Sequence, residues 1–170
     1  NAGFQPVATI RQQQGIARAI VPPPPLAHTD VRAVEERDWP ELLELDTGAY
    51  GADRQTILQA LQVKSDCIVA ERAGQIAGYA MIRNFGRGQV IGPVVADSDA
   101  LAIQLIAPLI QKRAGTFLRL DTPVEEGELT EFLSAAGLVL YDTVTEMYLG
   151  KQRRATTGAV LYGLAAHSLG

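Results

Sequence analysis

The sequence predicts one α/β domain, with a mixed central sheet of about six or seven strands and about four helices. Two observations support this fold class. Apolar strand-like runs alternate with segments of helical periodicity, and one strand, residues 89–96, is apolar on both faces and leads directly into a helix. A strand that is buried on both faces belongs at the centre of a sheet.

Periodicity and turn residues place the elements after residue 30 in order. The predicted segments are a strand at 31–34, helices at about 39–47 and 54–61, strands at 66–71, 76–83 and 89–96, a helix at about 99–113, a strand at 116–120, a helix at 127–136 and a strand at 143–149. Residues 158–165 are compatible with a strand or a helix, because a short apolar run does not distinguish them.

Pro93 interrupts the strand that is expected at the centre of the sheet. Proline has no N–H to donate to a neighbouring strand. Pro93 must therefore sit at a bulge, at an edge, or where two neighbouring strands separate.

A short pattern occurs near both ends of the chain, in residues 2–10 and 136–144. Each copy has alanine and glycine followed by apolar residues, which predicts a helix stopped by glycine and then a strand. We interpret residues 1–20 as the last strand of a preceding domain of the same kind. Four consecutive prolines make residues 21–30 a stiff linker. Residues 31–150 then form the main domain, and residues 151–170 complete it.

Composition limits the classes of function. The chain has 170 residues, of which 47% are hydrophobic, and a formal net charge of −4. A net negative charge disfavours a general nucleic-acid role, because phosphate binding requires a basic face. No membrane-spanning run or signal peptide is recognisable, so we expect a cytoplasmic protein without a membrane partner.

The residues that bind metals or form disulfides are few. The single cysteine, Cys67, excludes an internal disulfide and opens an apolar strand, so we expect a core residue. The two histidines, His28 and His167, have no metal-ligand spacing, and we expect no metal. The basic residues of segment 151–154 are expected to form a solvated turn.

The order of elements resembles the GCN5-related N-acetyltransferase (GNAT) fold over residues 31–150. A narrower resemblance, to the C-terminal domain of tandem bacterial GNAT proteins, implies that residues 1–20 are the last strand of a first GNAT domain. The positions that carry it are Asp46, 51–54, Gly78, Tyr79, Arg83, 91–96, 120–123 and 161–165.

The resemblance implies acetyl-CoA as the co-substrate. In this family the pantetheine arm lies where the central strand and the next strand separate, and the pyrophosphate lies at the N-terminus of the following helix. The implied binding positions are Val94, Val95, Ala96, Ser98, Asp99 and Ala100. A helix N-terminus attracts anions. The family's phosphate turn, Arg/Gln-x-x-Gly-x-Gly/Ala, is replaced here by residues 97–102, in which the carboxylates of Asp97 and Asp99 repel a phosphate.

The resemblance also identifies candidates for proton transfer. The tyrosine position that protonates the leaving thiolate in active members is occupied by Leu133. Tyr141 is our candidate for that role, with Tyr79 and Tyr148 as alternatives, although a tyrosine in a strand is often a packing residue.

Three charged residues are candidates for the acceptor side. Asp121 follows a strand beside the expected gap and is predicted to act as general base or amine anchor, or else to cap the following turn. Asp46 and Arg54 are predicted to hold substrate, or else to pair with each other.

Two functions follow from the resemblance. The first is transfer of an acetyl group from acetyl-CoA to a small-molecule or protein amine by direct attack. The second is a non-catalytic GNAT-like domain that packs on an active first half and shapes its acceptor site or mediates dimerisation. Because the apolar residues 4–10 need a partner edge, a homodimer formed by strand exchange is also expected.

Overall fold

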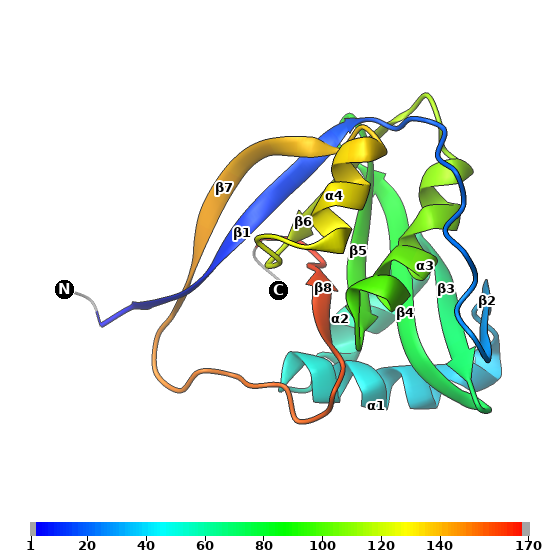
Figure 1. The fold of residues 1–170 in the computed structure, drawn as a ribbon. Coiled ribbons are helices and arrows are strands. Elements are labelled where there is room, and N and C mark those ends of the chain that lie inside the picture. Colours follow the sequence, from blue (N-terminus) through cyan, green and yellow to red (C-terminus); the bar gives the residue numbers. More distant parts are fainter. Residues whose placement is uncertain (1–2, 168–170) are drawn as a thin grey trace.

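The computed structural model describes residues 3–167. Among these residues, strands form one eight-stranded sheet with four α-helices packed against it (Figure 1). The elements are β1 (Gln5–Ile16), β2 (Thr29–Ala33), α1 (Trp39–Tyr50), α2 (Gln55–Gln62), β3 (Ser65–Arg72), β4 (Gln75–Phe85), β5 (Gly88–Ala96), α3 (Asp99–Gln111), β6 (Phe117–Thr122), α4 (Glu128–Ala135), β7 (Val139–Tyr148) and β8 (Val160–Gly163). The predicted fold class is confirmed.

The strand order is β2-β3-β4-β5-β6-β1-β7, and β8 pairs with β5 outside this path. The pair of β5 and β6 is parallel, and the other pairs are antiparallel. β1 therefore lies between β6 and β7, two strands that follow it by about a hundred residues in the sequence. Residues 4–10 thus have a partner edge within their own chain, and strand exchange between two copies stays a prediction.

The predicted element positions agree closely with the structure except at α1 and β7. Strand β7 begins at Val139, four residues before the predicted start at 143. Helix α1 continues through Gly48 to Tyr50, one turn beyond the predicted end, and stops at Gly51 with φ 79°. Gly51 donates its N–H to the Thr47 carbonyl at 2.9 Å, which is the left-handed C-cap that glycine favours. The ambiguous segment 158–165 contains the strand β8.

Two apolar layers pack against opposite faces of the sheet. Side chains alternate along β4, so Tyr79 and Met81 pack with α1 and α2, whereas Ala80 and Ile82 pack with α3 and α4. Cys67 is buried in the first of these layers, and burial raises the pKa of its thiol to about 12. It is a core residue, as predicted.

The proline-rich linker runs along α3 from the end of β1 to the far edge of the sheet, where β2 lies (Figure 1). Gln104 of α3 donates its side-chain N–H to the Pro24 carbonyl at 2.6 Å. Within the described part of the chain, no helix has the length and apolarity to cross a membrane.

Candidate functional site

The strands β5 and β6 separate after a short stretch of pairing. Their parallel ladder ends at Ile91 and Leu120, and Pro93 follows two residues later. Pro93 has no N–H with which to extend the ladder. Of the three alternatives for Pro93, the structure shows two: the register of β5 with β4 shifts at Gly92 and Pro93, and β5 separates from β6 there, so that a gap opens between their ends.

The last strand of the chain occupies this gap. β8 runs antiparallel to the end of β5, and Figure 1 shows the two strands side by side. Leu164, just after β8, donates its N–H to the Asp121 carbonyl of β6 at 2.8 Å. β8 therefore bridges the separated strands. Its pairs with β5 are Val94–Gly163, Val95–Leu161 and Ala96–Val160.

Close backbone contacts hold β8 in place. Gly92 has φ 153°, and a Cβ there would lie 2.0 Å from the Leu164 carbonyl oxygen, so only glycine fits. Arg83 donates from one guanidinium nitrogen to the Gly92 carbonyl at 2.7 Å and from the other to the Ala165 carbonyl. This side chain joins β4, β5 and the segment after β8.

The N-terminus of α3 is capped by the chain itself. Ser98 is the N-cap, and its Oγ accepts the Leu101 N–H at 3.3 Å. Asp97 pairs with Arg72 at 2.8 Å, and Asp99 accepts the Leu129 N–H of α4 at 3.0 Å. An anion approaching this helix end meets two carboxylates that already have partners.

Tyr162 connects β8 to the same helix end. Burial, the negative charge of Asp99 and a hydrogen bond to Asp99 raise the pKa of Tyr162 to about 12. The tyrosine is 8% exposed and packs in the core with α3 and α4. Asp99 thus ties α3, α4 and β8 together.

The residues present do not fit a pantetheine arm and a pyrophosphate at the positions that the resemblance implies. The backbone of Val94–Ala96 faces β8, and the turn formed by Ser98, Asp99 and Ala100 carries carboxylates with partners within the chain. An acyl-CoA molecule would need β8 to leave the gap.

Asp46 and Arg54 form a buried ion pair on the face of β4 that packs against α1 and α2. Arg54 donates to both Asp46 oxygens at 2.8 Å, and the two side chains are 2% and 1% exposed, respectively. Tyr79 donates its hydroxyl to the same carboxylate, and burial raises the pKa of Tyr79 well above its usual value. The alternative prediction, that Asp46 and Arg54 pair with each other, is what the structure shows.

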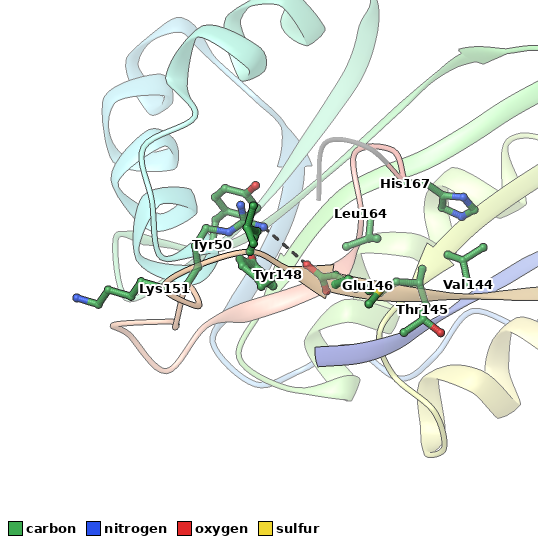
Figure 2. A pocket seen from close by; sticks show the side chains of 12 residues that line it. Tyr50, Val144, Thr145, Glu146, Tyr148, Lys151, Leu164 and His167 are labelled. Atoms are coloured by element: carbon green, nitrogen blue, oxygen red, sulfur yellow. Dashed lines mark ion pairs between the residues drawn. The ribbon is translucent and has the colours of Figure 1, made fainter. Parts of the chain in front are cut away.

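A cavity of about 540 Å³ lies between the end of α1 and the end of β7 (Figure 2). Tyr50 and Tyr148 line it, and the Arg153 guanidinium lies 4.0 and 4.8 Å from their ring centroids. Glu146 pairs with Arg153 at 3.7 Å. Arg153 was expected in a solvated turn, but it lies against two aromatic rings. Its cation–π contacts hold segment 149–159 over the end of α1.

The two predicted catalytic residues, Asp121 and Tyr141, do not come together. Asp121 is 2% exposed, receives two hydrogen bonds from Arg119 at 2.8 Å, and lies 3.2 Å from His167. Tyr141 is 68% exposed on β7, and β1 lies between their strands. Their catalytic roles stay predictions. No group of three metal-ligating side chains that could hold an ion occurs among residues 3–167.

Sequence reasoning missed the residues that fill the gap and the cavity, Arg83, Arg153 and Tyr162. Arg83 and the segment around Tyr162 carried the family resemblance, but nothing in their spacing indicated that they meet. Several of their contacts join residues far apart in the chain, such as Arg83 with Ala165, 82 positions away, and Tyr162 with Asp99.

The fold and this site match a known family. Residues 42–163 match the family described as acetyltransferase (GNAT) domain. The chain therefore belongs to the GNAT acetyltransferase family, as the resemblance implied.

Three similar proteins show how the chain compares with longer proteins. YitH of Bacillus subtilis (strain 168), an uncharacterized N-acetyltransferase, is 28% identical over 171 residues, which cover 99% of this chain and 59% of YitH. A proposed acetyltransferase from Pyrococcus horikoshii has a similar fold, with a TM-score of 0.69 and 22% identity over 98% of this chain and 53% of its own. A GCN5-related N-acetyltransferase from Sphaerobacter thermophilus has a TM-score of 0.61, with 18% identity over 91% of this chain and 56% of its own. This chain thus spans little more than half of each protein.

Proposed function

We propose that this chain is a non-catalytic GNAT domain within an acyl-CoA-dependent N-acyltransferase. Acetyl transfer from acetyl-CoA to a small-molecule or protein amine takes place in a second GNAT domain, which this domain supports and whose acceptor site it shapes. The observation that carries the proposal is the position of β8, which pairs with β5 where the family resemblance places pantetheine.

The energy of displacing β8 supports this proposal. Tyr162 is 8% exposed and Leu164 is 4% exposed. Burying a large apolar side chain stabilises a protein by about 1.5–3 kcal/mol, so exposing both would cost about 3–6 kcal/mol. That cost lowers the affinity of any ligand that needs the open gap by about a hundredfold to ten-thousandfold.

The charges at the N-terminus of α3 also disfavour the binding of acetyl-CoA. A helix N-terminus stabilises an anion by about 0.3–1 kcal/mol. A carboxylate about 4 Å from a phosphate charge repels it by about 4 kcal/mol at an effective dielectric constant of about 20. Pairing of Asp97 with the half-exposed Arg72 offsets part of this repulsion, but no cationic side chain among residues 3–167 forms an ion pair with Asp99.

Calorimetric titration of acetyl-CoA into the 170-residue chain tests the proposal. We expect no binding in the micromolar range, and hydrogen exchange at 160–163 that acetyl-CoA does not change. The variant Asp97→Asn, which removes one exposed carboxylate, should bind no better, because β8 still fills the gap. Micromolar binding accompanied by faster exchange in β8 would overturn the proposal, because the strand would then be a displaceable cover over a working groove.

A further inference from the structure

Strand β7 lies at the edge of the sheet and exposes apolar side chains on both faces. Within the described part of the chain its only strand partner is β1, so its outer edge is unpaired. The exposed fractions are 53% for Val139, 43% for Leu140, 68% for Tyr141, 37% for Val144 and 50% for Met147. Natural proteins usually protect such an edge with charges, bulges or a covering segment.

The strands β1 and β7 are the two copies of the repeated pattern, in which Gly3 corresponds to Gly137 and Thr9 to Thr143. They pair antiparallel, and Ile10 lies opposite Val144, which is its own counterpart in the repeat. Two equivalent strands paired in this way are related by a local two-fold axis through that residue pair. The axis passes through the middle of the ribbon.

Irregularities in the pairing obey the same symmetry. The register skips one residue in each strand, Val7 between Pro6 and Ala8 in β1, and Tyr141 in β7. Val7 and Tyr141 are counterparts in the repeat. A bulge at equivalent positions of both strands is a structural feature that the sequence pattern did not require, and it supports the equivalence independently.

The two-fold rotation predicts which strand would pair with the free edge of β7. The outer edge of β1 pairs with β6, through Arg11–Ile16. The same rotation that carries β1 onto β7 carries β6 to a position beside residues 145–150. The burial of the two strands differs accordingly: Ile10 and Gln13 are each 2% exposed, whereas their counterparts Val144 and Met147 are 37% and 50% exposed.

We propose that the outer edge of β7 pairs with the penultimate strand of a second GNAT domain, whose own last strand is β1. The two domains then exchange their last strands and share one continuous sheet, with the local two-fold axis at Ile10 and Val144. The lengths of the relatives agree with this partner, because the chain covers 59% of YitH and 53% of the Pyrococcus horikoshii protein. Each relative has room for another domain of this kind.

This inference rests on the proposed function in one respect, the presence of a second GNAT domain. The two are tested by different measurements. Acetyl-CoA binding to the 170-residue chain concerns the gap at β8, whereas the present inference concerns the outer edge of β7. A failure of either leaves the other standing.

Hydrogen exchange followed by mass spectrometry tests the pairing. The probes are the 170-residue chain and full-length YitH, compared over the segment that aligns with 145–148. We expect exchange there to be at least roughly tenfold slower in YitH, because its second domain pairs with this edge, while the β3–β4 hairpin exchanges alike in both proteins. Equal exchange of the β7 segment in both proteins would overturn the proposal.

A substitution on the exposed face of β7 distinguishes an effect on the contact with the second domain from an effect on folding. Met147→Lys should leave the melting temperature of the 170-residue chain unchanged, whereas lysine at the aligned position of YitH should lower that of the full-length protein. Lysine in place of Val63, which is 80% exposed on another surface, is the matched control and should change neither. Protection of β7 that rises with the concentration of the 170-residue chain would overturn the proposal and identify a second copy as the occupant.

Discussion

β5 and β7 are both rich in apolar residues, yet their surroundings are opposite. β5 is buried from Val90 to Ala96 and has partners on both edges, with β4 on one side and β6 followed by β8 on the other. β7 is exposed over nearly its whole length and has a partner on one edge. The inner gap of this domain is thus completed by its own chain, whereas the outer edge of β7 is unpaired within the described residues and is the site of the proposed domain contact.

The largest effect is expected at the buried ion pair beside β4. Asp46→Ala removes the carboxylate that pairs with Arg54 and accepts the Tyr79 hydroxyl. The buried Arg54 guanidinium then loses its carboxylate partner, so the free energy of unfolding should fall by about 3–5 kcal/mol in urea denaturation. Glu44→Ala, an exposed carboxylate on the same helix, should change it by no more than about 0.5 kcal/mol. A cost below about 1 kcal/mol for Asp46→Ala would show that the pair contributes little.

A glycine substitution tests whether β8 completes β5. Gly92→Ala places a Cβ against the Leu164 carbonyl, so we expect a loss of about 3 kcal/mol and faster hydrogen exchange at 160–163. Gly74 also has a positive φ, 78°, but has nothing within 4 Å. Gly74→Ala should therefore cost only about 1 kcal/mol, with β8 exchange unchanged. Equal effects of the two substitutions would contradict the close contact with β8.

The smallest effect is a pH dependence at the same strand. Because the pKa of Tyr162 is raised from 10.0 to about 12, the folded state favours the neutral phenol. This contribution to stability is fully present below pH 10 and is lost as the pH rises through about 12. Tyr162→Phe lacks it, so the difference in unfolding free energy between the two proteins should shrink over that range. Tyr79 titrates in both proteins, so its contribution cancels in the difference. A difference that is constant with pH would contradict the burial of the Tyr162 hydroxyl beside Asp99.

Interactions between residues near in sequence account for the correct predictions. The periodicity of apolar residues and the alternation along β4 are local patterns, so most helices and strands lie close to their predicted positions. Pro93 likewise indicated an interruption of the strand pairing, because the absence of its N–H is a property of one residue. The Asp46–Arg54 pair could be predicted because only one turn separates the two helices that carry these residues.

The candidate site was less predictable, because its residues are positioned by distant elements. Tyr141 lies on an apolar strand, as predicted, but β1 lies between that strand and the strand of Asp121. Arg153 occurs in a basic segment that is typical of solvated turns, yet Tyr50 and Tyr148 provide aromatic faces for it. The spacing of residues in the sequence predicts neither the strand between Tyr141 and Asp121 nor the contacts of Arg153.

The sequence alone determined where most strands and helices form, where the pairing of the central strand is interrupted, and which strand is repeated. These properties depend on backbone preferences and on side-chain periodicity over a few residues. Only the tertiary structure decided that β8 fills the gap, that β1 enters between β6 and β7, and that the outer edge of β7 stays open. Many apolar strands of suitable length could pair locally with a given strand. The choice among them depends on the free energy of the whole packed sheet.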